Sequence, residues 1–206
     1  HKYFSNKNYL DLVQKRFGKN AKKNVVELSK IRLKRKILEN WVFMPNKIKV
    51  FKNYSFRDHR GYYWTSWKKN SMKKIYFKHD KFSLSRKNVL RGMHGDKKTW
   101  KLVSCPYGKF LLIVVNYIRS SRNYLKSKSF ILSHENGVQV LIPPNYANGH
   151  LCLSDECLFH YKLSYKGRYF DAKNQFSLRW NDPKWKIKWQ IKKPILSSRD
   201  KKAKLL

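Results

Sequence analysis

Acidic residues are scarce in this chain of 206 residues: 12 Asp and Glu stand against 48 Lys and Arg, a formal net charge of +36. A charge of this size suits binding to nucleic acid, to an anionic membrane surface or to an anionic small ligand. The basic residues are spread over the whole length rather than gathered in one stripe. We therefore expect no specific nucleic-acid partner, although non-specific attraction of anions in low salt is expected.

Cysteine is also scarce, and long apolar runs are missing. Cys105, Cys152 and Cys157 form neither an even disulfide framework nor a paired C-x-x-C arrangement, which predicts buried, reduced thiols. The seven histidines lack the H-x-H or H-x-x-x-H spacing of metal ligands, so we predict no metal and no cofactor. No run approaches the roughly 18 to 20 apolar residues of a membrane span, and the N-terminus has no apolar signal stretch. We expect a cytoplasmic protein without a membrane partner.

Residues 1–43 differ from the remainder, because they carry 12 Lys and Arg against 3 acids, no proline and a single glycine. Within 24–41 the apolar residues recur near helical spacing: Leu28, Ile31, Leu38 and Trp41. We predict a basic N-terminal extension over 1–43, helical or disordered, before a second domain at 44–206. Few bulky aromatics line the apolar side of this segment, which favours a docking helix over a membrane-surface helix.

From Ile48 onward, short apolar or alternating runs are separated by Gly, Pro, Asn, Asp and Ser, a pattern typical of an all-β sandwich or barrel. The continuous apolar run 110–115 predicts a strand covered on both faces. We predict strands at 47–52, 61–67, 74–83, 99–105, 109–117, 126–132, 137–142, 150–153 and 156–164.

Strand alternation assigns several polar side chains to apolar faces. Over 74–82 it places His79 and Lys81 on the face of Ile75 and Phe77. Over 156–163 it directs Tyr161 inward, where an ordinary core tyrosine with a satisfied hydroxyl is the simpler interpretation.

A histidine near the end of another strand is a candidate for chemistry. Arg91 and His94 flank Gly92, where the backbone could approach a ligand closely. A lone histidine is more often structural than catalytic, and only the company of Arg91 and the nearby Lys101 favours a functional role for His94.

Eight short motifs also occur in a fixed order: RDHRGY (57–62), VLRGMH (89–94), WKLVSC (100–105), LSHEN (132–136), IPPNYANG (142–149), YK (161–162), WND (180–182) and LSSRD (196–200). In this order and spacing the chain resembles the dTDP-4-dehydrorhamnose 3,5-epimerase family over about 48–200. The resemblance implies an all-β cupin, a jelly-roll double-stranded β-helix sandwich that forms homodimers without a metal. It also implies epimerisation at C3 and/or C5 of a nucleotide-linked 4-keto-6-deoxy sugar, for surface polysaccharide biosynthesis.

The resemblance assigns a proton-transfer set. A 4-keto group acidifies the C–H bonds at C3 and C5, so epimerisation needs a base, an acid on the opposite face and a cation for the enolate. His94 matches the base, and Asp200 matches the carboxylate that pairs with it. Tyr161 matches the acid, and Lys101 matches the lysine beside the sugar oxygen.

The resemblance also assigns substrate-binding residues and shows departures. Arg60 and Arg91 match arginines that hold the diphosphate, and Phe56 matches an aromatic ring stacked on the base. The family's second active-site histidine is replaced by Asn148, and its Gln-Asp-Asn is replaced by His79-Asp80-Lys81.

The substrate therefore remains open from the sequence. Two strings, HGDxKTWKLV and PPxxxNGHL, resemble a branch associated with GDP-linked deoxyheptose epimerases, so the nucleotide could be GDP rather than dTDP. From a different class, the alternative is a non-catalytic basic cupin that binds polyanions through its positive field. A related 3,4-ketoisomerase is less favoured because its motif pattern differs.

Overall fold

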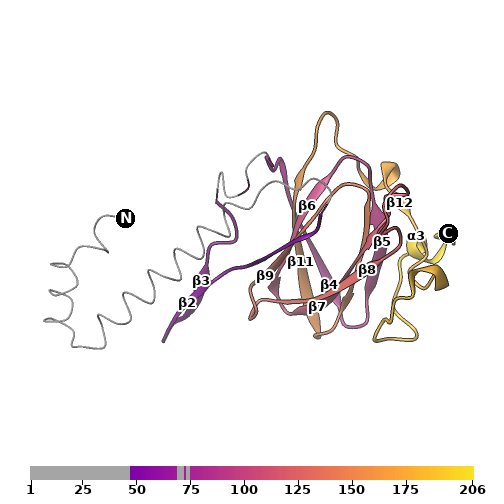
Figure 1. Cartoon of the computed structure of the whole chain (residues 1–206). Coiled ribbons are helices and arrows are strands. Elements are labelled where there is room, and N and C mark those ends of the chain that lie inside the picture. The colour runs from indigo at the N-terminus through magenta and orange to yellow at the C-terminus, as the bar shows by residue number, and fades with distance from the viewer. Residues whose placement is uncertain (1–46, 69–71, 73–74) are drawn as a thin grey trace, which may run out of the picture. The chain divides into compact units, whose positions relative to one another are not determined.

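A computed structural model describes residues 47–68, 72 and 75–206, and it is built almost entirely of β-strands (Figure 1). The helical elements in this part are short: two 3-10 helices, Ala172–Asn174 and Pro183–Trp185, and α3 (Ser198–Lys201). The strands are β1 (Lys49–Lys52), β2 (Ser55–Asp58), β3 (Gly61–Trp64), β4 (His79–Arg86), β5 (Leu90–Gly95), β6 (Trp100–Tyr107), β7 (Lys109–Asn116), β8 (Ser127–Ser133), β9 (Val138–Ile142), β10 (Tyr146–Cys152), β11 (Glu156–Ser164) and β12 (Phe176–Ser177).

Two five-stranded antiparallel sheets make up the domain. The first sheet has the order β1-β9-β6-β11-β4, and the second has the order β12-β5-β10-β7-β8. Apart from β7 and β8, neighbours in each sheet are not consecutive in the chain, as expected of a jelly roll, while β2 and β3 form a separate hairpin. The all-β cupin prediction is confirmed by this architecture.

The core follows from the alternation of strand β7. Phe110, Leu112 and Val114 point between the sheets, where they join a buried cluster that includes Val103 and Phe159 of the first sheet. The intervening residues 111, 113 and 115 belong to a second buried cluster with Leu178 and Trp185 of the C-terminal segment. The prediction that the run 110–115 is covered on both faces is therefore confirmed, and burial on both faces explains its lack of polar residues.

The C-terminal segment 176–206 packs on the outer face of the second sheet and returns to strand β5. Isolated bridges join Val89 to Ile195 and Leu178 to Lys204, and α3 lies against β5. Trp185 is 2% exposed, and its indole nitrogen donates to the Arg179 carbonyl. This packing brings residues near the end of the chain beside β5, about a hundred positions earlier in sequence.

Each of the nine predicted strands overlaps an observed one, but several boundaries differ. Strand β4 begins at His79 rather than at residue 74, and β10 begins at Tyr146 rather than at 150. The predicted ranges omit the hairpin strand β2, the two-residue β12 and β5, although His94 was expected near the end of a strand. The predicted extension 1–43 and its helix over 24–41 lie outside the described residues. All three cysteines are free and buried, as predicted.

Candidate active site

The candidate catalytic residues come from both sheets and from α3. His94 of β5 pairs with Asn148 of β10 in the second sheet. Lys101 of β6 in the first sheet donates from Nζ to Asn148 Oδ1 at 2.9 Å, so this bond joins the two sheets. Tyr161 of β11 packs against the cluster between the sheets, as strand alternation predicts.

Gly92 explains why β5 approaches β10 so closely. Its φ is +134°, and a Cβ placed there would lie 2.5 Å from Gly149 Cα on β10. A residue with a side chain would therefore clash with the neighbouring backbone as well as strain its own. The sequence suggested that the backbone at Gly92 approaches a ligand; the structure shows that it approaches β10, between Arg91 and His94.

His94 is paired with a buried carboxylate. Its Nε2 lies 2.8 Å from Oδ1 of Asp200, which is 3% exposed on α3. Ser197, the N-cap of α3, donates from Oγ to Asp200 Oδ2. Burial raises the pKa of the Asp200 carboxyl, but His94 and Ser197 outweigh burial, and the net pKa lies below its usual value. Asp200 is thus held as a carboxylate, and its contact with Nε2 favours a proton on that nitrogen of His94.

The other ring nitrogen of His94 faces a serine. Ser177 of β12 is paired with His94 in the ladder, and its Oγ lies 3.1 Å from His94 Nδ1. Arg199 of α3 donates from Nε to the same Oγ at 2.7 Å. Both nitrogens of the imidazole are therefore engaged by groups from the C-terminal segment.

Lys101 is buried, with 8% of its surface exposed. Burial lowers its pKa, the negative charge of Asp96 opposes this effect and the positive charge of Arg199 adds to it, so that the pKa of Lys101 is about 8. An ammonium with this pKa is a stronger proton donor than an ordinary lysine and remains largely charged at pH 7. The bond to Asn148 fixes its position.

Tyr161 lies opposite Lys81 of β4 in the first sheet. Burial raises the pKa of the Tyr161 phenol, while the positive charges of Lys81 and Arg91 act in the opposite direction. Lys81 donates from Nζ to the Tyr169 hydroxyl at 3.0 Å. A protonated phenol is the form needed to return a proton to a carbanion.

His79 joins the same group of aromatic residues. Its Nε2 lies 3.4 Å from the Tyr165 hydroxyl, and its ring contacts Tyr169 edge-on with centroids 4.8 Å apart. The ladder with β11 places His79 and Lys81 on the face of β4 that Tyr161 shares, and both are half-buried. Ile75 and Phe77, predicted to lie on that face too, instead pack with Leu102 and Leu141 in a separate cluster, because the chain before His79 is not part of the strand.

Arg91 reaches from β5 across to β4. Its Nε donates to Ser85 Oγ at 3.0 Å, and its Nη2 donates to the Leu84 carbonyl at 3.1 Å. His150, its ladder partner on β10, is 3% exposed and stacks on Phe159 with ring centroids 4.2 Å apart. Burial, together with the nearby charges of Arg91 and His94, lowers the pKa of His150 to about 3, although Asp200 acts in the opposite direction.

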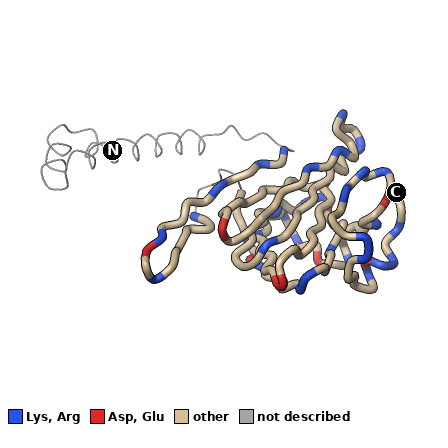
Figure 2. Tube along the Cα trace, turned by 90° about the horizontal axis from the view of Figure 1, so that it is seen from below, with Lys and Arg blue, Asp and Glu red and all other residues tan. Residues whose placement is uncertain are grey.

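Phe56 and Arg60 are not brought to this group within the chain. They lie on the β2–β3 hairpin, which projects from the sandwich (Figure 1). Phe56 is 66% exposed and stacks on Tyr63, while Arg60 pairs with Asp58 at 2.7 Å. In the described part of the chain, the contacts recorded for these two residues stay within the hairpin. Figure 2 shows that lysine and arginine are also spread along most of the described trace, as the sequence suggested.

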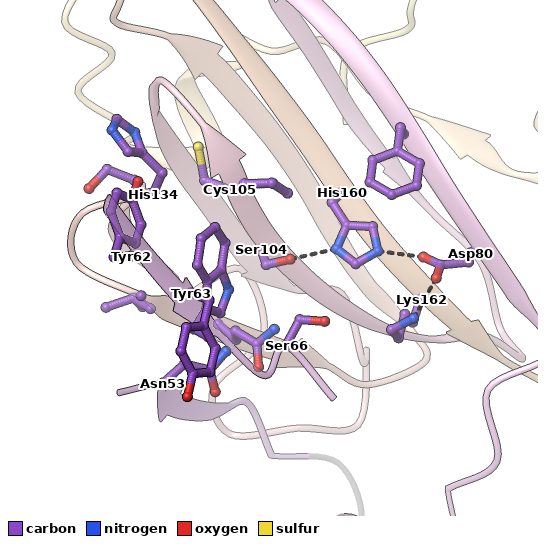
Figure 3. Close-up of a pocket in the computed structure, with 17 residues that line it drawn as sticks. Asn53, Tyr62, Tyr63, Ser66, Asp80, Ser104, Cys105, His134, His160 and Lys162 are labelled. Carbon is purple, nitrogen blue, oxygen red and sulfur yellow. Dashed lines mark hydrogen bonds and ion pairs between the residues drawn. The ribbon is translucent and has the colours of Figure 1, made fainter. Parts of the chain in front are cut away.

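A hollow of about 400 Å³ lies on the other face of the first sheet, beneath the hairpin (Figure 3). Ser104 Oγ lies 2.7 Å from His160 Nδ1, and Asp80 bridges His160 Nε2 and Lys162 Nζ. These four polar groups satisfy one another. None of the candidate catalytic residues lines this hollow, so it is separate from the His94 site.

Comparison with known proteins decides the family. The family model for dTDP-4-dehydrorhamnose 3,5-epimerase matches residues 46–206. The chain belongs to this family. It is 33% identical to the dTDP-4-dehydrorhamnose 3,5-epimerase of Salmonella typhimurium over 160 residues, which cover 73% of this chain and 86% of that protein. The corresponding Escherichia coli enzyme is also 33% identical, with 71% and 83% of the two chains covered.

Solved structures of epimerases share the fold. A dTDP-6-deoxy-D-glucose-3,5-epimerase from Legionella pneumophila, in complex with dTDP-4-keto-L-rhamnose, has a TM-score of 0.72 and 31% identity, with 77% of this chain and 87% of that chain covered. A dTDP-4-dehydrorhamnose 3,5-epimerase from Bacillus anthracis, with TDP and PPi bound, has a TM-score of 0.73 and 27% identity, covering 80% and 98%. The match to the family model and the similarity to solved epimerase structures therefore lead to the same family.

Three polar residues beside the candidate set were not predicted from the sequence: Ser177, Arg199 and His150. Arg199 lies inside the LSSRD motif, so the motif offered a signal for it. His150 lies inside the string PPxxxNGHL, so that string offered a signal for it. Ser177 lies in none of the quoted motifs, and only the pairing of β12 with β5 places it beside His94.

Proposed function

We propose that the protein epimerises C3 and/or C5 of a nucleotide-linked 4-keto-6-deoxy sugar through an enolate. The observation that carries this proposal is the His94–Asp200 pair in a chain of the epimerase family. Lys101, a buried lysine whose pKa is lowered to about 8, belongs to the same candidate set. Such a pair supplies a base, and the lysine supplies a cation for the developing oxyanion.

In this reaction His94 takes the proton from the sugar carbon. Asp200 holds the Nε2 proton and stabilises the imidazolium that forms. The electrons of the broken C–H bond move toward the 4-oxygen, where the Lys101 ammonium stabilises the charge, positioned by Asn148. Tyr161 then returns a proton from the opposite face, and the sugar carbon is inverted.

The nucleotide diphosphate is assigned to the basic residues around this set. Arg91 is exposed and reaches from β5 to Ser85 of β4, and Lys81 adds a charge near Tyr161. Guanidinium and ammonium groups suit phosphate oxygens. His79, with its tyrosine neighbours, lies on the same side of β4 as Lys81 and completes the proposed substrate-binding group.

We propose that the working form is a homodimer. Phe56 and Arg60 are assigned to the nucleotide by their motif, yet they lie on a projecting hairpin. A second copy would allow each hairpin to serve a neighbouring site, with Arg60 leaving Asp58 for the diphosphate. Residues 1–43 are proposed as a separate extension of the 44–206 domain. A cytoplasmic location follows if the substrate is a cytoplasmic nucleotide sugar, and in the described residues no helix is long and apolar enough to cross a membrane.

The test is conversion of defined substrates. Purified protein is incubated with dTDP- and GDP-linked 4-keto-6-deoxy sugars, and the product configuration at C3 and C5 is read by NMR. We expect conversion by the wild type, loss of it in His94→Asn, and retention in His134→Asn, which changes a histidine outside the candidate site. No conversion of either substrate, together with polyanion binding that is insensitive to His94→Asn, would instead support the basic cupin alternative.

A further inference from the structure

Ser177 and Arg199 form a hydrogen-bonded chain that ends on the proposed base. The Arg199 Nε–H donates to Ser177 Oγ at 2.7 Å, and Ser177 Oγ lies 3.1 Å from His94 Nδ1. Ser177 is half-buried and is held in register with His94 by the β12–β5 pairing. The proton-transfer roles assigned above do not use either residue.

The direction of each hydrogen bond in this chain is fixed by its partners. Asp200 is a carboxylate and only accepts, so the 2.8 Å ion-pair contact favours the tautomer of His94 with its proton on Nε2 and the lone pair on Nδ1. Arg199 only donates, so it occupies a lone pair of Ser177 Oγ. The remaining hydrogen of the serine is therefore the donor to Nδ1.

We propose that Ser177, held by Arg199, is a positioning residue that fixes Nδ1 of His94 as the basic nitrogen and stabilises it in both protonation states. This inference rests on the proposed epimerase function. With neutral His94, the Ser177 hydroxyl donates to Nδ1 and keeps the ring in place. Nδ1 has a single lone pair, so the Ser177 hydroxyl hydrogen must rotate away before the sugar C–H reaches it. The electron pair of that C–H bond then goes toward the 4-oxygen, and its proton goes to the released lone pair of Nδ1.

The same serine then serves the protonated ring. Because its hydrogen has already rotated away, the new Nδ1–H donates to the Oγ lone pair that Arg199 leaves unused. A hydrogen bond to a charged group contributes more than one between neutral groups. Ser177 therefore stabilises the state after proton abstraction more than the state before it, which is the condition for raising the rate.

The experiment measures deuterium uptake from D₂O into the dTDP- or GDP-linked 4-keto-6-deoxy sugar that the wild type turns over. For Ser177→Ala we expect kcat for exchange to fall about ten- to a hundredfold, the effect of one lost bond to a charged group, with KM unchanged. The isotope effect with substrate deuterated at the reacting carbon should increase, because abstraction becomes slower. A purely structural role for Ser177 would not change this isotope effect.

Two matched variants complete the experiment. Ser177→Thr keeps the hydroxyl and should retain kcat within about threefold. Ser133→Ala removes another buried hydroxyl, one that accepts from the Asn136 amide outside the site, and should leave kcat unchanged. If Ser177→Ala fails to fold, Ser177→Cys replaces it, because a thiol preserves the volume and is a poor hydrogen-bonding group; its kcat must fall in the same way.

The outcomes separate the two proposals. If the wild type exchanges and Ser177→Ala has an equal kcat, the role of Ser177 is overturned and the epimerase proposal stays intact. Where the alanine variant does not fold, an equal kcat in Ser177→Cys has the same meaning. No exchange by folded wild-type protein with either nucleotide sugar overturns the epimerase proposal itself.

Discussion

Replacement of Lys101 by methionine should stabilise the fold while it abolishes the proposed activity. Lys101 is 8% exposed, and burial lowers its pKa from 10.5 to about 8. That difference corresponds to about 3 kcal/mol of free energy against the charged form in the folded protein. Methionine has a similar length and no charge. It leaves Asn148 Oδ1 without its donor, which costs about 1 kcal/mol, so the net gain is about 2 kcal/mol at pH 7.

The gain should depend on pH in a defined direction. Below pH 8 the folded and unfolded chains both hold the lysine proton, and the full cost of the buried charge is present. Between pH 8 and 10.5 the unfolded chain keeps a proton that the folded chain has released, so wild-type stability rises with pH. The advantage of Lys101→Met should therefore shrink over this window.

The assay is chemical or thermal unfolding at pH 7, 9 and 10.5. For a protein of this size, about 2 kcal/mol corresponds to a rise of about 4 to 8 °C in Tm at pH 7. Lys109→Met is the control, because Lys109 is exposed on β7, and its Tm should stay near that of the wild type. A lower Tm for Lys101→Met at pH 7, or an advantage that grows with pH, would refute the reasoning about the buried charge.

Three further outcomes are expected. His150 has a pKa of about 3 in the folded protein against an ordinary value of 6.5, so the unfolded chain takes up a proton first as the pH falls. The free energy of unfolding should therefore decrease by about 4 to 5 kcal/mol between pH 6.5 and 3, and acid unfolding of His150→Phe should lack this dependence. Asp80→Asn should cost about 1 kcal/mol in urea unfolding, because Asp80 is half-exposed, and an unchanged midpoint would show that its pairs contribute nothing. Gly108→Ala should cost about 2 kcal/mol, since φ is +72° and the new Cβ would lie 2.0 Å from the Glu156 carbonyl oxygen; full wild-type stability would contradict this.

Local patterns in the sequence predicted the strands well because each face of a strand meets a different environment. The apolar run of β7 and the inward direction of Tyr161 both follow from alternation against a core on one or two sides. Boundaries were less well predicted. Residues 75–78 alternate between buried and exposed as the residues of β4 do, but they lie before the first residue of that strand. Alternation of apolar and polar residues therefore does not by itself mark where the pairing of β4 begins.

Contacts between distant segments were predicted only where motifs supplied them. His94 and Asp200 were expected to meet because of the family resemblance, and the structure brings them to 2.8 Å. Ser177 belongs to no such motif, and its place beside His94 depends on the pairing of a two-residue strand, which no local preference specifies. The contacts of Phe56 and Arg60 stay within the β2–β3 hairpin, so only the family motif assigns these two residues to the site.

The most direct test of the central proposal is the number of solvent deuterons that enter the sugar. Wild-type protein is incubated in D₂O with dTDP- and GDP-linked 4-keto-6-deoxy sugars, and the sugar is analysed by mass spectrometry and NMR, with His94→Asn in parallel. We predict one or two deuterons at C3 and C5 with the wild type and none above background with the variant. Equal incorporation by His94→Asn, or none by folded wild-type protein, would contradict the proposal that His94 is the base of an epimerase.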